Sequence, residues 1–169
     1  MGKKLKSDGE KVRSIIADAG GRIVGRTKLQ KIAYLLEVAG EGDNFHFEYH
    51  HYGPYSEDLT RAASLASIVG DIGEKEKIAK WGGSYSIYTA PASPQEDGIR
   101  QHLARTAAEA NAVVLELAAT AAYFAANGEN DPWHETEARK PDKAAEGRLD
   151  EAKRLYGVLR EISEKLPAI

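Results

Sequence analysis

The chain has 169 residues, a net charge of −3, 42% hydrophobic and 29% charged residues, and no cysteine. This length is typical of one globular domain, and the balance of apolar and charged residues excludes a disordered chain. The missing cysteines exclude disulfides, thiol chemistry and Cys-ligated zinc or iron–sulfur centres. The chain has no apolar run of about eighteen residues, and its basic start is not followed by the apolar segment of a signal peptide. We therefore expect a cytoplasmic protein with no membrane segment.

Three helices are predicted in the first half of the chain, each from a capping residue followed by an apolar stripe. They begin at Ser7, Thr27 and Ser56, and each ends at a glycine. In the second helix, three side chains are expected to point away from the stripe: Gln30, Lys31 and Tyr34. In the third helix, the side expected to be buried comprises Leu59, Ala62, Ala63, Ala66 and Val69.

Short strands are predicted between and after these helices. Ile23-Val24 is an apolar pair between glycines, and residues 45–50 alternate as in a strand, after which residues 52–55 break it. Residues 72–78 and 85–89 are typical of the two arms of a hairpin. The order of these elements favours a winged-helix-like module over residues 1–90.

The second half of the chain is predicted to be a helical bundle, residues 94–169, that packs on the first module to form one compact domain. Ser93, Pro94 and Glu96 give a helix-start pattern. The apolar stripe that follows, from Ile99 to Phe124, predicts one long helix or two nearly collinear ones. Further helices start at Pro132 and Pro141, and the last of them runs on to Pro167. The expected fold class is therefore mainly α with a small antiparallel β element.

Catalytic and metal-binding patterns are weak. His46, Glu48 and His50 share one face of the predicted strand, and two imidazoles with a carboxylate are a possible zinc or iron ligand set. A solvent-facing strand surface explains the same alternation. His134-Glu135 lacks the second histidine of a zincin helix, and the chain contains no nucleophile elbow, P-loop or dinucleotide-binding glycine motif. We therefore expect no enzyme activity and no cofactor.

A basic cluster precedes and enters the second helix. It comprises Arg22, Arg26, Lys28 and Lys31. These cations suit phosphate contacts, so a winged-helix transcriptional regulator that binds DNA is the alternative function. The third helix offers Glu57 and Asp58 at its start, which phosphate would repel, and the chain as a whole is not basic.

Aromatic residues are concentrated around the predicted turns, where tyrosine and tryptophan are favoured anchors of protein interfaces. They are Tyr34, Tyr49, Tyr52, Tyr55 and Trp81. About half of these rings are expected to pack in the core instead.

Two paired motifs are similar to a known family. They are Lys-Leu-Gln-Lys-Ile-Ala-Tyr-Leu-Leu at residues 28–36 and Tyr-Gly-Pro-Tyr-Ser at residues 52–56, with Asp-Pro-Trp at residues 131–133 and Arg-Lys-Pro at residues 139–141. Together these segments resemble the YwgA-like proteins and the related, phage-associated Panacea-type antitoxin domains. The resemblance implies a mainly helical domain and, for Panacea-type members, neutralisation of a toxin in a toxin–antitoxin system by direct contact. Tyr55-Ser56 departs from the Panacea pattern and favours the YwgA-like branch.

The sequence thus favours a non-catalytic protein-binding module, an antitoxin-like or phage-associated regulator that neutralises or recruits a partner protein. A stiff Gly-Pro bend is expected to hold two tyrosines beside the lysine-bearing second helix. The expected partner-binding residues are Lys28, Gln30, Lys31, Tyr34, Tyr52, Gly53, Pro54, Tyr55 and Trp133. The expected partner is another protein, with DNA as the alternative, and the chain would act as a monomer or a homodimer.

Overall fold

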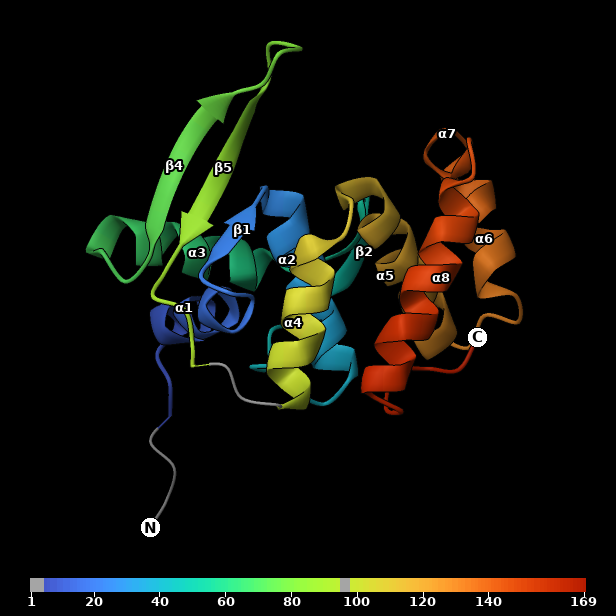
Figure 1. Ribbon diagram of the computed structural model, residues 1–169, viewed down its shortest axis with the longest axis horizontal. Helices are drawn as coiled ribbons and strands as arrows, with labels where there is room; N and C mark the ends of the chain where they lie inside the picture. The colour runs from blue at the N-terminus through green and yellow to red at the C-terminus, as the bar shows by residue number, and fades with distance from the viewer. Residues whose placement is uncertain (1–4, 95–97) are drawn as a thin grey trace.

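The computed structural model describes residues 5–94 and 98–169, and it places eight helices and five strands among them (Figure 1). The fold is mainly helical with two small antiparallel sheets, as the sequence predicts. Within the described residues, every helix is too short or too polar to cross a membrane.

The larger sheet consists of β1 (Arg22–Val24), β4 (Gly73–Ile78) and β5 (Ser84–Thr89), in the order β1-β5-β4. Both neighbouring pairs are antiparallel. Figure 1 shows the β4–β5 hairpin projecting away from the helices, so the predicted hairpin is confirmed. Three helices lie at its base: α1 (Asp8–Asp18), α2 (Arg26–Val38) and α3 (Glu57–Val69).

Some predicted helix starts are confirmed and others are wrong. The hydroxyls of Ser7 and Ser56 accept hydrogen bonds from backbone amides in the first turns of α1 and α3, as a capping residue should. Helix α2 does not start from Thr27. It starts at Arg26 behind Gly25, which supplies no side-chain cap.

The predicted helix start at Ser93 is also wrong, because the Ser93 hydroxyl donates to Asp18 of α1 instead. The helix begins later, at Ile99. Glu96, the other half of the predicted capping pattern, lies outside the described residues.

The second sheet is a two-stranded hairpin of β2 (Glu48–His50) and β3 (Gly53–Tyr55), inserted between α2 and α3. The predicted strand over residues 45–50 is therefore shorter than expected. Residues 53–55 do not simply break it. They return as its antiparallel partner, with Pro54 opposite Tyr49.

The second half of the chain is helical, as predicted, in five pieces: α4 (Ile99–Glu109), α5 (Ala112–Ala126), α6 (Pro132–Arg139), α7 (Pro141–Ala144) and α8 (Arg148–Ile162). Helices α4 and α5 are not collinear. Ala110 and Asn111 are both extended, and the chain turns back between the two helices (Figure 1). Similarly, Gly147 in the left-handed region separates α7 from α8.

Helix α5 is the centre of the packing. Most of its residues are buried, and it contacts α2, α6, α8 and β3. Apolar side chains from both halves of the chain form one core cluster. Arg100 of α4 joins the halves further, because it pairs with Asp18 of α1 at 2.6 Å and with Asp43 at 3.0 Å. The β2–β3 hairpin packs against this shared core through the contact of β3 with α5.

Candidate functional site

The paired motifs, residues 28–36 and 52–56, do meet, but in the interior of the protein. Gln30 donates from its side-chain amide to the carbonyl of Ser56 at 2.9 Å and accepts from the Ser56 amide at 2.8 Å. These two bonds fix the start of α3 against α2. Gln30 is therefore not on the expected partner-binding surface, because it is buried and its polar group is satisfied by backbone rather than by water.

Lys31 is buried as well, with only 1% of its surface exposed. Its Nζ donates to the carbonyl oxygen of Pro54 at 2.7 Å. Burial lowers the pKa of Lys31 to about 7, and the nearby Glu116 carboxylate opposes that shift. The sequence correctly predicts that Lys31 and the Gly-Pro bend are neighbours, but Lys31 is not a surface cation.

A buried group of charges lies beside this lysine. Glu116 of α5 pairs with Lys143 at 2.6 Å and with Lys140 at 3.2 Å. Lys140 also donates to the carbonyl of His51 at 3.0 Å, which ties the α6–α7 junction to the tip of the β2–β3 hairpin. Lys140 and Lys143 therefore share one carboxylate near Lys31, and the charges of these two lysines lower the pKa of Lys31 further.

Gly53 is required at its position for two reasons. Its φ is +89°, a conformation that favours glycine, and a Cβ there would clash with Thr120 Oγ1. Thr120 is fully buried, and its hydroxyl finds no hydrogen-bond partner among the described residues. The β3 backbone therefore lies directly against α5, with a polar atom left unsatisfied at the contact.

The aromatic residues divide between the core and the surface. Tyr34 is buried and packs edge to face on Phe47, with ring centroids 5.2 Å apart, so it does not lie on a partner-binding surface as expected. Trp133 is half-buried and packs against Tyr156. Of the tyrosines in the bend, Tyr55 is half-buried, and Tyr52 is exposed beneath the ammonium of Lys143.

Most of the predicted partner-binding residues therefore support the fold rather than form a surface. Those buried or bonded inside the protein are Gln30, Lys31, Tyr34, Gly53 and Pro54. Lys28 is half-buried, and its Nζ donates to the carbonyls of Ala108 and Ala110 at the end of α4. Among these nine expected residues, only Tyr52 is largely exposed, with 51% of its surface accessible to solvent.

The predicted basic cluster is divided in the same way. Lys28 caps the carbonyl end of α4, and Lys31 is buried under Pro54. Arg22 and Arg26 remain exposed, with Arg26 lying 3.8 Å from Glu74. Because two of its four cations already have internal partners, the cluster presents much less positive charge than the sequence suggests.

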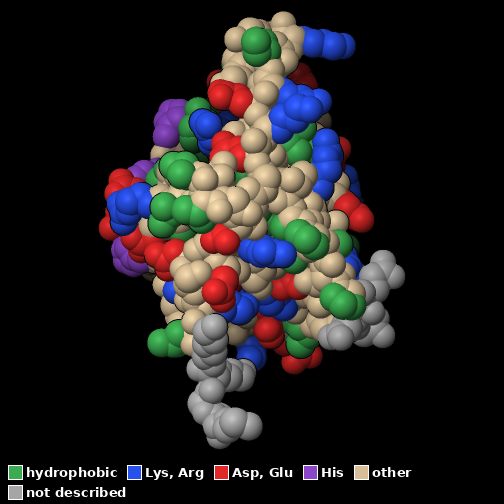
Figure 2. All heavy atoms as spheres, turned by 90° about the vertical axis from the view of Figure 1, so that its left-hand side faces the viewer, with side chains coloured by type: hydrophobic (Ala, Val, Ile, Leu, Met, Phe, Trp, Pro, Cys, Tyr) green, Lys and Arg blue, Asp and Glu red, His purple; other side chains and the backbone are tan. Residues whose placement is uncertain are grey.

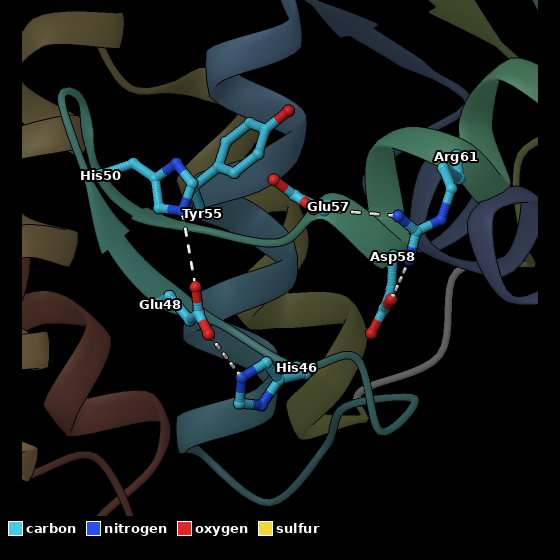
Figure 3. A pocket seen from close by; sticks show the side chains of 7 residues that line it. All are labelled: His46, Glu48, His50, Tyr55, Glu57, Asp58 and Arg61. Atoms are coloured by element: carbon cyan, nitrogen blue, oxygen red, sulfur yellow. Dashed lines mark hydrogen bonds and ion pairs between the residues drawn. The ribbon is translucent and has the colours of Figure 1, made fainter.

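A shallow polar pocket lies between the β2–β3 hairpin and the start of α3 (Figure 3). His46 and His50 approach the two oxygens of Glu48, at 3.3 Å and 3.8 Å, while Arg61 pairs with Asp58 at 2.6 Å. The predicted shared face of the two histidines and Glu48 is present. Within residues 5–94 and 98–169, however, no group of three or more His, Asp or Glu side chains is arranged to hold a metal ion.

Of a further group of exposed apolar residues, only Trp81 was singled out from the sequence. The group lies on the last turns of α3 and on the β4–β5 hairpin, and its members are Leu65, Ile68, Val69, Ile78 and Trp81. Val69 was expected to be buried, but it lies on the outer side of α3 with Leu65. A signal was present: positions 65, 68 and 69 have the i, i+3, i+4 spacing of a second stripe, opposite the buried alanines.

We call these five residues the α3–β4 surface. Ile68 is 79% exposed and Trp81 80% exposed. Figure 2 faces this side of the molecule and shows hydrophobic side chains among acidic and basic ones, beneath the projecting hairpin. Leu65, Ile68 and Val69 share the outer side of α3, whereas Ile78 and Trp81 lie toward the tip of the β4–β5 hairpin. Exposed apolar clusters of this kind mark interaction sites in soluble proteins.

The comparisons with known proteins give a partial relationship. The chain is 37% identical over 68 residues to the uncharacterized protein YwgA of Bacillus subtilis (strain 168). The similar segment covers 40% of this chain and 40% of that protein, so the match spans less than half of either. No family model matches the chain. No solved structure matches it. The expected similarity to YwgA is therefore supported over part of the chain.

Proposed function

We propose that this chain is a non-catalytic protein-binding module of the cytoplasm, and that it contacts its partner through the α3–β4 surface. The observation that carries the proposal is the exposure of five large apolar side chains on α3 and the hairpin. When a partner covers exposed isoleucine and tryptophan side chains, the free energy of the complex falls by roughly 25 cal/mol per Å² of apolar area removed from water. Tryptophan is also among the residues most enriched at binding hot spots.

The element order supports a winged-helix-like architecture for the first module. Helices α1, α2 and α3 precede the β4–β5 hairpin, and β1 joins the sheet beside β5. In DNA-binding modules of this kind, a helix enters the major groove with polar or basic side chains. Helix α3 instead presents Glu57 and Asp58 at its start and Ile68 near its end. This pattern suits a protein partner better than a phosphate backbone.

The kind of partner follows from the resemblance to the YwgA-like and Panacea-type proteins. An antitoxin-like or phage-linked role, in which this chain neutralises or recruits a toxin by direct contact, is consistent with an exposed apolar surface. Genes next to the one for this chain are the natural candidates to test as toxins.

Affinity capture with matched variants tests the proposal. Wild-type protein and the Ile68→Ser variant would be used as bait in lysate of the source cell, with Val158→Ser as the control. Val158 is an exposed apolar residue on α8, outside the α3–β4 surface. We expect a partner that wild type and Val158→Ser both capture and that Ile68→Ser loses. Equal capture by all three baits would contradict the proposal.

DNA binding is the second candidate, favoured by the exposed Arg22 and Arg26 beside a hairpin that carries Lys75, Lys77 and Lys80. Phosphate contacts release counterions, so binding to the DNA upstream of the gene would weaken steeply as salt rises. Replacing both arginines by alanine should then reduce the salt slope. Binding that is absent at low salt, or insensitive to these substitutions, would exclude this role.

A further inference from the structure

The outer strand of the larger sheet has one open edge. Because the strand order is β1-β5-β4, β5 covers one side of β4, and the described residues place no strand on the other. The backbone groups on that side can be identified from the ladder. The Gly25 amide donates to Ser86, and the Ala90 amide donates to Gly21, so residues 86 and 90 of the β5 segment bond toward β1.

Bonding direction alternates along an antiparallel strand, so Tyr85, Ile87 and Thr89 bond toward β4. Their partners are Lys77, Lys75 and Gly73. The bond from the Ala79 amide to Gly83 continues the same set. The backbone amides and carbonyls of the alternate residues therefore face the open edge: Glu74, Glu76 and Ile78.

This pattern makes a second copy of the chain a poor occupant of the edge. Outward-bonding residues of one antiparallel strand pair only with outward-bonding residues of the other. Two β4 strands would thus place Glu opposite Glu or Ile, and Lys75 or Lys77 opposite another odd-numbered residue. The registers with the greatest overlap put like charges directly opposite each other, which is destabilising.

We propose that the open edge of β4 binds an extended segment of a different protein, in which acidic and basic residues alternate. Basic side chains would lie opposite Glu76 and acidic ones opposite Lys75 and Lys77, which β4 itself cannot supply. Such cross-strand pairs stabilise an added strand, and the main-chain bonds supply the affinity. The exposed Ile78 gives the same segment an apolar contact at the end of the strand.

The position of the edge links this inference to the proposed function, on which it rests. Only residues 70–72 separate α3 from β4, and in Figure 1 the last turns of α3 extend past β4 on the side opposite β5. A segment added to β4 would therefore end beside the exposed residues of α3. One partner could cover both parts of the α3–β4 surface.

The test is an NMR titration of the full chain with two synthetic peptides. The probe is Thr-Val-Glu-Lys-Glu-Arg-Thr, and the control, Glu-Glu-Thr-Val-Thr-Lys-Arg, has the same composition without alternating charges. We expect the probe, at millimolar concentration, to shift the amides of Glu74, Glu76 and Ile78 and to slow their hydrogen exchange. The absence of these effects, or equal effects from the control peptide, would overturn the inference.

Two variants test the backbone contact itself. Glu76→Pro removes an outward amide while keeping the β4–β5 bonds, since proline is tolerated on an edge strand where its nitrogen faces solvent. Glu76→Gln removes the charge and keeps the amide. We expect Glu76→Pro to weaken probe binding by about tenfold, the effect of losing one or two backbone hydrogen bonds, and Glu76→Gln to weaken it by less.

Equal binding of the probe by the two Glu76 variants would overturn strand addition. The outcomes also separate this inference from the proposed function. If Ile68→Ser loses the captured partner but Glu76→Pro keeps both partner and probe, strand addition is wrong and the binding module stands. If Ile68→Ser keeps the partner, the proposed contact surface on α3 is wrong, and the titration alone decides whether β4 accepts a strand.

Discussion

Lys31 donates a hydrogen bond to the carbonyl oxygen of Pro54 across 2.7 Å, from a side chain that is almost wholly buried. This bond holds the β2–β3 hairpin on α2. It also explains why the Lys-Leu-Gln-Lys and Tyr-Gly-Pro motifs occur together in the chain: each supplies one half of a buried contact. The contact therefore stabilises the fold, and its contribution to the free energy of unfolding should depend on pH.

The first prediction concerns pH. Burial lowers the pKa of Lys31 from 10.5 to about 7, so the folded protein binds fewer protons than the unfolded chain between these values. The free energy of unfolding should therefore rise with pH from about 7 to 10, by up to about 1.4 kcal/mol for each pKa unit of the shift. Below pH 7, Lys31 is charged in the folded protein, so the cost of burying its charge is greatest there.

Denaturant unfolding of wild type and Lys31→Met across this range measures the effect. The difference in stability between the two proteins should change by several kcal/mol in favour of wild type as the pH rises, because methionine does not titrate. Parallel pH profiles for the two proteins would contradict the assignment of this shift to Lys31.

The second prediction concerns the close approach of β3 to α5. Gly53→Ala introduces a Cβ at positive φ and against Thr120 Oγ1, so it should destabilise the protein by about 1 to 3 kcal/mol. Gly157→Ala is the matched control, because Gly157 lies within α8 with open space around it, and alanine there should stabilise by about 0.5 to 1 kcal/mol. Thermal or urea unfolding measures the change in stability of both variants. Changes of the same sign would contradict the requirement for glycine at position 53.

The third prediction concerns the unsatisfied hydroxyl of Thr120. Thr120→Val replaces it with a methyl group of similar size and should raise the free energy of unfolding by about 1 kcal/mol, since the buried oxygen has no partner. Thr136 is equally buried, but its hydroxyl donates to the Pro132 carbonyl at 2.7 Å. Thr136→Val should therefore destabilise by a similar amount, as measured by urea unfolding. A loss of stability in both variants would show that the Thr120 hydroxyl is satisfied in solution.

The fourth prediction concerns the ion pairs between the two halves of the chain. Arg100→Met removes the cation shared by the poorly exposed carboxylates of Asp18 and Asp43, leaving Asp43 only the more distant Lys6 at 3.7 Å, and should cost about 3 kcal/mol. Arg61 makes an equally short pair with Asp58, but on the surface, so Arg61→Met should change stability by less than about 0.5 kcal/mol. Chemical denaturation measures the stability lost by each variant. Similar losses would mean that burial does not make the Arg100 ion pairs stronger than the exposed Arg61 pair.

Local physics accounts for what could be predicted from the sequence. Ser7 and Ser56 cap their helices, Asp131 caps α6, and the β4–β5 hairpin forms where alternation and turn residues predict it. These features depend on bonds and side-chain periods within a few residues, so neighbouring residues in the chain determine them. The Gly-Pro bend was also expected beside the lysine-bearing second helix, and Lys31 does bond to Pro54.

Tertiary contacts decided the rest. Ser93 has the pattern of a helix cap, but Asp18 offers its hydroxyl a partner 75 positions away in the chain. Lys31 has the spacing of a solvent-facing residue, yet β3 and α5 close over it, and its long side chain reaches a backbone carbonyl in the interior. Val69 and Ile68 stay exposed because nothing in the described chain packs on the outer side of α3. The sequence by itself determined most of the helices and the β4–β5 hairpin, because their caps and side-chain periods are local. Strand β3, the later start of α4 and the burial of polar and apolar side chains depended on distant segments that no local pattern encodes.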